Sequence, residues 1–156
     1  MVNLYYYKTA IGDIGIAENG NAITNLFFKR KKQVDNQGLK ETDLLREASK
    51  QLNEYFMGNR FKFDLPLFIS GTEFQQKVWR ALESIPYGET RSYKQIAEAI
   101  GNPKACRAVG MANNRNPISI IIPCHRVIGS TGRLVGYGGG LDIKEKLLQL
   151  ERDNVR

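Results

Sequence analysis

The chain has 156 residues, of which 42% are hydrophobic and 25% charged, and its formal net charge is +7. This composition is that of a soluble globular protein with one medium or two small domains, and it excludes disordered and membrane classes. No apolar stretch approaches the roughly 18 residues of a membrane span, and the N-terminus lacks the basic start and apolar region of a signal peptide. Two cysteines are too few for a disulfide framework and favour a reducing, cytoplasmic compartment.

The first seventy residues have the pattern of a small α/β domain. Aromatic and branched residues at 4–8, 14–16 and 23–28 predict strands, and Asn19-Gly20-Asn21 is a strong hairpin signal. From about residue 41 apolar residues recur at helical spacing, up to a stop signal at Gly58-Asn59. The pattern breaks near residue 70, so we place one domain over residues 1–70 and a second over residues 71–156.

The second half has the pattern of short helices with tight connections. Gly101-Asn102-Pro103 joins two of them and predicts a helix-turn-helix. The helix that follows, at about 104–114, is rich in small residues. The expected helix starts are Thr72-x-x-Gln75, Ser92-x-x-Gln95, Asn102-Pro103 and Asp142-x-x-Glu145.

The positive charge gathers in this second half. Between Tyr87 and Gly140 seven basic residues stand against two acidic ones. Such an excess favours an anionic partner, and nucleic acid is the first candidate. A generally basic proteome would give the same excess and is the alternative on charge alone.

The run Ile120-Ile121-Ile122-Pro123-Cys124-His125-Arg126-Val127 holds the chain's densest chemistry. Three branched residues before a proline predict a buried strand that ends there. A thiol is nucleophilic only as thiolate, and an adjacent base or cation raises the thiolate fraction. His125 is the only histidine, and Glu151, expected after the last helix, would orient its ring if the fold brings it back. We therefore interpret Cys124 as a reactive thiol.

Simpler interpretations of the same side chains stay open. A free cysteine is often a small buried hydrophobe, which would also suit Cys124. We interpret Cys106 as packing, because no imidazole is near it in sequence. Three Cys and His side chains, two of them adjacent, are too few for a structural zinc site.

Pro123-Cys124-His125-Arg126-Val127 resembles the active-site signature of the O6-alkylguanine-DNA alkyltransferases. The resemblance runs from Gly71 to Glu151, whereas residues 1–70 match the family's variable N-terminal domain only in coarse pattern. It implies an α/β chain with a ribonuclease H-like first domain and a mostly helical, winged-helix-like second domain. Further matching segments are Ile85-Pro86-Tyr87-Gly88, Ser92-Tyr93, Gly101-Asn102-Pro103-Lys104-Ala105, Arg107-Ala108-Val109-Gly110, Asn116-Pro117 and Gly139-Gly140-Leu141.

The resemblance also implies catalytic roles. Cys124 would accept the alkyl group, and His125 would take the thiol proton through a water molecule. Glu151 would polarise the imidazole, Tyr93 would help to protonate the departing guanine, and Asn116 would tie the recognition helix to the active-site segment. No metal or cofactor is implied, and the zinc ligands of some members are absent.

The implied partner is double-stranded DNA that bears alkylated guanine, with O4-alkylthymine as a further substrate. Arg107 would fill the space that the flipped nucleotide leaves. Where some members have a serine that bonds the guanine oxygen, this chain has Gly138, whose backbone N–H would serve. We expect a monomer with no obligate protein partner and no membrane association. The remaining expected contacts to DNA or base are Ala105, Arg115, Arg126, Val127, Tyr137 and Gly139.

Two other functions compete with repair. A cysteine hydrolase would use Cys124 and His125 for acyl transfer, turn over many times and need no DNA. A non-catalytic DNA-binding protein would recognise the lesion or regulate transcription, but family relatives that only bind lesions lack the cysteine. The thiol at position 124 therefore favours single-turnover repair.

Overall fold

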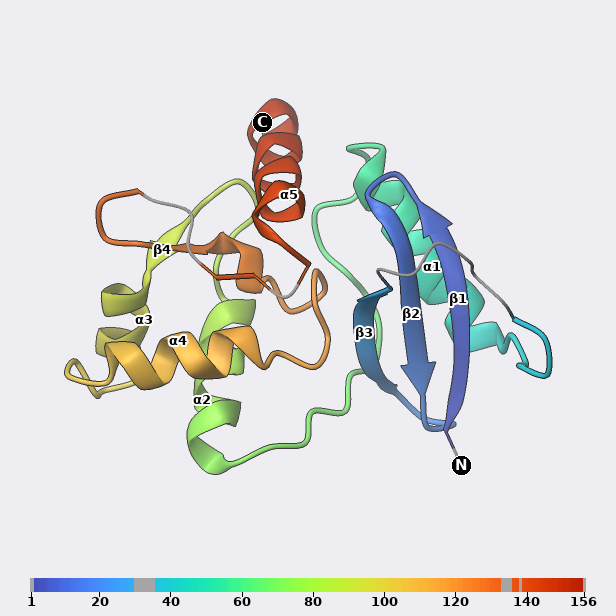
Figure 1. Cartoon of the computed structure of the whole chain (residues 1–156), viewed down its shortest axis with the longest axis horizontal. Helices are drawn as coiled ribbons and strands as arrows, with labels where there is room; N and C mark the ends of the chain where they lie inside the picture. The colour runs from blue at the N-terminus through green and yellow to red at the C-terminus, as the bar shows by residue number, and fades with distance from the viewer. Residues whose placement is uncertain (1, 30–35, 133–135, 138, 156) are drawn as a thin grey trace. The chain divides into compact units, whose positions relative to one another are not determined.

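The computed structural model describes residues 2–29, 36–132, 136–137 and 139–155. The chain forms two compact units, Met1–Ile69 and Ser70–Arg156 (Figure 1). In the part of the chain that is described, no helix is long and apolar enough to cross a membrane.

The first unit is an antiparallel sheet covered on one face by a helix (Figure 1). Strands β1 (Asn3–Thr9), β2 (Gly12–Glu18) and β3 (Ile23–Lys29) pair in the order β1-β2-β3, at the positions that the sequence predicts. Helix α1 (Asp43–Phe56) begins at Thr42, whose hydroxyl accepts a hydrogen bond from the backbone N–H of Leu45. Sheet and helix bury a shared apolar core made of Ile14, Ile16, Ile23, Leu26, Leu45, Ala48 and Leu52.

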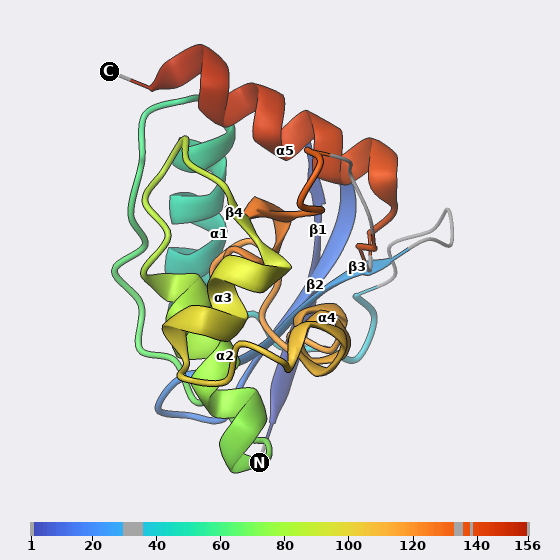
Figure 2. The ribbon, with the colours of Figure 1, turned by 90° about the vertical axis from the view of Figure 1, so that its left-hand side faces the viewer.

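The second unit is mostly helical. Helices α2 (Glu73–Glu83) and α3 (Tyr93–Ala99) both begin with the capping boxes predicted at Thr72 and Ser92. Helices α3 and α4 (Cys106–Asn114) form the expected helix-turn-helix, and both pack against α2 (Figure 2). The last helix of the described residues, α5, spans Leu141–Asn154. The predicted fold class, an α/β unit followed by a mostly helical unit, is confirmed.

Two predicted helix starts are wrong. Helix α4 has Ala105 rather than Asn102 at its N-cap, because the N–H of Ala105 closes a separate turn onto the carbonyl of Asn102. Helix α5 has Gly140 at its N-cap with φ of 100°, so Asp142 lies inside the first turn. Glu151, which was expected after the last helix, lies within α5.

The predicted strand before Pro123 is also wrong. Residues 118–122 form a tight loop in which the N–H of Ile122 bonds the carbonyl of Ile118 at 2.9 Å. Ile120 has a left-handed φ of 71°, which a strand does not allow. The apolar side chains are buried as the sequence predicts, but the backbone that carries them is a loop and not a strand. Strand β5 (Val127–Ile128) follows a few residues later and forms a short parallel pair with β4 (Arg91–Ser92).

Candidate active site

Cys124 follows the tight loop of residues 118–122 and lies in the interior of the second unit. Cys124 opens a single 3-10 turn, Cys124–Arg126, and only 4% of the residue is exposed. Burial raises the pKa of its thiol, while hydrogen bonds from Asn116 and Ser119 and the charge of Lys144 lower it. The thiol is therefore held protonated at neutral pH and needs a base to become nucleophilic.

His125 and Glu151 meet in the same interior, although 26 positions separate them in sequence. His125 Nε2 lies 2.7 Å from Glu151 Oε2, and both side chains are at most 1% exposed. Burial lowers the pKa of His125 below its ordinary value, against the opposing effect of Glu151. The imidazole is therefore neutral near pH 7 and able to accept a proton.

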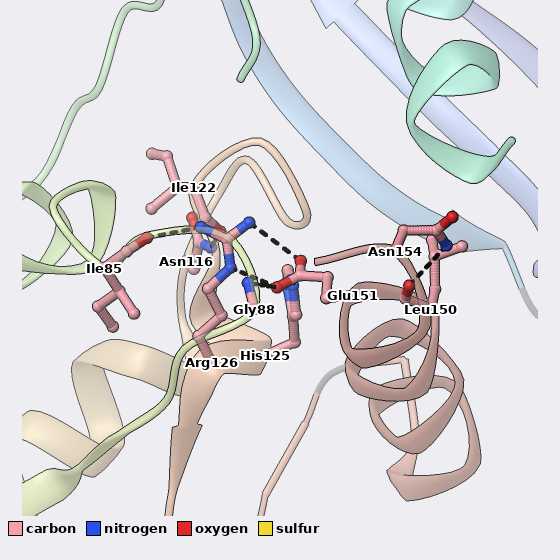
Figure 3. Close-up of polar contacts among 9 residues, drawn as sticks. All are labelled: Ile85, Gly88, Asn116, Ile122, His125, Arg126, Leu150, Glu151 and Asn154. Atoms are coloured by element: carbon pink, nitrogen blue, oxygen red, sulfur yellow. Dashed lines mark hydrogen bonds and ion pairs between the residues drawn. The ribbon is translucent and has the colours of Figure 1, made fainter. Parts of the chain in front are cut away.

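Arg126 completes this network (Figure 3). Its guanidinium donates to both carboxylate oxygens of Glu151, from Nε to Oε1 at 2.8 Å and from Nη2 to Oε2 at 3.0 Å. A third nitrogen donates to the carbonyl of Ile85 at 2.6 Å, and the group lies 5.7 Å from the centre of the Tyr87 ring. Arg126 was expected to contact DNA, but the residue is only 7% exposed and its charge faces Glu151.

Glu151 is thus held as a carboxylate. Its oxygens also accept the backbone N–H of Gly88 at 3.1 Å. Burial raises the pKa of Glu151, but the hydrogen bonds from His125 and Arg126 and the charge of Arg126 outweigh it and leave that pKa below its ordinary value. A fixed negative charge on one side of the imidazole favours proton transfer to the ring.

Two expected residues lie close to the thiol. Asn116 donates from Nδ2 to the carbonyl of Ile122 at 2.7 Å and accepts the N–H of Ile118 at 3.0 Å, so it links the end of α4 to the loop before Cys124. Tyr93 opens α3. Burial raises the pKa of its phenol, the nearby Cys124 raises it further, and a hydrogen bond from Asn113 lowers it.

The segment expected to form the base pocket is partly described. Val127 is buried in β5, and Gly139 is buried as well. Burial raises the pKa of Tyr137 well above its ordinary value, and Cys124 and Glu151 add to the increase, which places this phenol near the thiol. Gly138 lies outside the described residues.

Three of the expected DNA contacts lie on α4 or at its two ends. Arg107 and Arg115 are exposed on α4 and at its C-terminal end, while Ala105 at its start is half-buried. Lys104 is exposed next to them, and the sequence from Asn102 to Asn116 contains no acidic residue. This helix and the residues at its two ends therefore carry positive charge without an acidic side chain.

Sequence reasoning missed Lys144 and Asn113. Lys144 on α5 is fully buried, its Nζ donates to the carbonyl of Gly136 at 3.3 Å, and burial lowers its pKa to about 8. A signal was available, because Lys144 and Glu151 occupy the same helical face as Leu147 and Leu148. A charged side chain on an apolar helix face is expected to be buried. Because burying an unpaired charge is costly, such a residue is expected to have a polar partner or a functional role. Asn113 on α4 is 1% exposed and had no such signal.

Two further features lie apart from the thiol. A cavity of about 370 Å³ opens beside Glu151, and Cys124 is not among its lining residues, which include Thr90, Ile128 and Leu148. Cys106, at the start of α4, is half-buried and keeps a free thiol. Within the described residues, no group of three His, Cys, Asp or Glu side chains is placed to hold a metal ion.

Comparison with known proteins covers both units. The family described as "6-O-methylguanine DNA methyltransferase, DNA binding domain" matches residues 73–153, and its "ribonuclease-like domain" matches residues 4–69. The methylated-DNA–protein-cysteine methyltransferase of Methanosarcina barkeri is 54% identical over 98% of this chain and 100% of its own length. The constitutive enzyme of that name from Bacillus subtilis is 54% identical over 94% of this chain and 95% of its own.

Solved structures agree. The O6-methylguanine methyltransferase of Mycobacterium tuberculosis superposes with a TM-score of 0.90 at 46% identity, covering 100% of this chain and 96% of that one. The M. tuberculosis protein in complex with DNA superposes with a TM-score of 0.88 at 47% identity, covering 97% and 94%. Sequence and fold agree over both units, and the chain belongs to the 6-O-methylguanine DNA methyltransferase family.

Proposed function

We propose that this protein repairs DNA by transferring an alkyl group from O6 of guanine in duplex DNA to Sγ of its own Cys124. The observation that carries the proposal is a buried thiol followed in one 3-10 turn by a neutral imidazole, which Glu151 holds at 2.7 Å. Family membership and the DNA complex of the M. tuberculosis relative support DNA as the partner.

The chemistry follows from the network. His125, bonded to Glu151 through Nε2, takes the thiol proton at Nδ1 through a water molecule. The thiolate attacks the saturated carbon, an S–C bond forms, and the O6–C bond breaks with its electron pair going to the guanine. Tyr93 supplies the proton that neutralises the departing base.

The transfer inactivates the protein irreversibly. Its product is a thioether, which has no carbonyl for water to attack. Cys124 is therefore not regenerated, and each molecule repairs one lesion. O4-alkylthymine presents the same kind of alkyl group and is a second substrate of the proposed reaction.

The target oxygen lies inside a duplex, so the nucleotide must leave the stack. Extrusion costs a few kcal/mol and costs least for a damaged, poorly paired base. Exposed Arg107 on α4 fills the space that the extruded nucleotide leaves in the base stack. Ala105 and Arg115 contact the DNA backbone. Val127, Tyr137 and Gly139 form the pocket for the flipped base, and Asn116 ties this pocket to α4.

The protein works as a monomer without an obligate protein partner. Both cysteines are free, and the proposed chemistry requires a reduced Cys124, which supports a cytoplasmic location. The cysteine-hydrolase alternative leaves the basic helix-turn-helix without a purpose. The non-catalytic alternative leaves the thiol and its buried network without one.

A titration tests the proposal. Increasing amounts of protein are added to a duplex with one O6-methylguanine, and restored guanine is measured at completion. We expect one guanine per protein molecule, and none with Cys124→Ser, which should still bind the duplex. More than one guanine per protein molecule would contradict the thioether product. Binding without restoration by the native protein would favour the non-catalytic alternative, and neither binding nor restoration would favour the hydrolase.

A further inference from the structure

Asn113 is a buried amide in the last turn of α4. Only 1% of the residue is exposed, and its Nδ2 donates to the backbone carbonyl of Cys124 at 3.4 Å. Its Oδ1 is buried and has no hydrogen-bond partner among the described residues. A half-satisfied amide costs stability relative to an apolar side chain of the same size. Stability alone therefore does not explain an asparagine here.

The ring of Tyr93, the first residue of α3, lies against the same face of α4. Gly110 precedes Asn113 by one helical turn, and a Cβ atom at Gly110 would lie 3.7 Å from the ring of Tyr93. The ring thus lies along Gly110, and the Asn113 side chain hydrogen-bonds the phenol. One amide group contacts both the backbone of the nucleophile and the side chain of the expected acid.

Helix α4 is also fixed on either side of Asn113. Trp79 on α2 donates from Nε1 to the carbonyl of Ala112 at 2.9 Å. Asn116 anchors the chain that leaves the helix to Ile122 at 2.7 Å. Asn113 lies between these two anchors, on a helix that exposes Arg107 and is followed by the exposed Arg115. Its position is therefore set by the helix that would meet DNA.

We propose that Asn113 is a positioning residue that holds Cys124 and the Tyr93 phenol in register with each other and with helix α4. This inference rests on the proposed alkyl transfer and adds a residue to it. The donated hydrogen bond also favours the phenolate of Tyr93, because it stabilises the deprotonated oxygen. Tyr93 then gives up its proton to the departing guanine more readily.

Single-turnover rates test the role on two substrates, a duplex with O6-methylguanine and the free O6-methylguanine base. Misplacement of a reacting group by a fraction of an ångström lowers rates strongly, so Asn113→Ala should slow both reactions by about tenfold. Affinity for the lesion duplex should stay within about twofold. Asn154→Ala is the matched control, because that amide also donates to a carbonyl, Leu150 at 2.8 Å, away from the reacting groups (Figure 3).

A double-mutant comparison separates positioning from folding. In a Tyr93→Phe background, Asn113→Ala should slow transfer by about threefold or less, since the bond to the phenol is already absent. The same tenfold loss in both backgrounds, or no loss in either, would overturn the proposal. If Asn113→Ala does not fold, Asn113→Leu replaces it, since its similar volume keeps the core filled.

The phenol itself provides an independent readout. With ring-labelled tyrosine and Tyr93→Phe for assignment, NMR titration should show a higher pKa for Tyr93 in Asn113→Ala than in the native protein. An unchanged pKa would count against the bond. If the native protein does not transfer a methyl group at all, the proposed function fails; if it does and Asn113 variants behave like Asn154→Ala, only this inference fails.

Discussion

Arg126 donates hydrogen bonds to both carboxylate oxygens of Glu151, from Nε at 2.8 Å and from Nη2 at 3.0 Å, inside the second unit. A buried cation thus fixes the orientation of the residue that holds His125. Because Glu151 sits on α5 and Arg126 follows the tight loop, the pair also joins two distant parts of the sequence. The site and the stability of this unit therefore depend on the same contact.

Glu151→Gln should damage both. Removing one charge leaves the Arg126 guanidinium buried without a counter-charge, which costs about 3 kcal/mol of unfolding free energy. Alkyl transfer should slow by at least about tenfold, since the imidazole loses its orienting carboxylate. Urea unfolding and single-turnover kinetics measure the two effects.

The control for that variant is Glu145→Gln on the same helix. Its carboxylate pairs with Arg152 at 3.0 Å, but both side chains are about half exposed. A change within about 0.5 kcal/mol is expected. The stabilisation from Glu151 should be complete above pH 4.5 and decline as pH falls toward its lowered pKa. Equal destabilisation by the two substitutions at pH 7 would show that the buried Glu151–Arg126 pair stabilises the fold no more than the exposed Glu145–Arg152 pair.

The pH dependence of transfer should reflect the lowered pKa of His125. An ordinary histidine is half protonated at pH 6.5, whereas burial keeps this one neutral there. The rate should be nearly constant from pH 8 down to 6.5 and fall only below that, as the base becomes protonated. In His125→Ala this acid limb should vanish. A half-loss of rate centred at or above pH 6.5 in the native protein would contradict the burial argument.

Arg107→Ala should separate flipping from chemistry. The exposed side chain is proposed to fill the gap in the stack, so its loss should slow repair of duplex lesions by about tenfold or more. Reaction with the free base needs no flipping and should stay within about twofold of native. Arg46→Ala, an exposed arginine on α1, is the control. Equal losses on both substrates would rule out the gap-filling role.

Lys144 should make stability depend on pH in the alkaline range. Burial lowers its pKa from 10.5 to about 8, so the unfolded chain binds more protons than the folded one between those values. The free energy of unfolding of the native protein should therefore rise with pH relative to Lys144→Met, by at most about 1.4 kcal/mol per pH unit. Urea unfolding of both proteins from pH 7.5 to 10 measures this difference. If their free energies of unfolding change equally with pH, the lysine is exposed to solvent and the prediction is wrong.

Local signals in the sequence predicted local structure well. Thr72 with Gln75 and Ser92 with Gln95 form capping boxes as expected, because both partners lie within one turn. The helix start at Asn102 failed because a competing turn uses the same residues. The left-handed φ of Ile120 could not be predicted, since a branched residue disfavours it and only the surrounding fold imposes it.

Some residues of the network around the thiol could be predicted from local sequence, and others could not. Cys124 and His125 stand out because they are adjacent and chemically distinctive. The burial of Arg126 against Glu151 is a contact across 25 positions, which no local pattern encodes. Asn113 is hidden for a further reason, because asparagine near a helix end is commonly a polar surface residue. The fold, not the sequence, turns it inward.

The most direct test of the account is the fate of the thiol. The native protein is incubated with duplex DNA that contains O6-methylguanine, digested, and examined by peptide mass spectrometry. We predict one methyl group in place of the thiol proton on the peptide that carries Cys124, at no more than one per molecule. Methylation at Cys106, or no methylation of the protein, would contradict it.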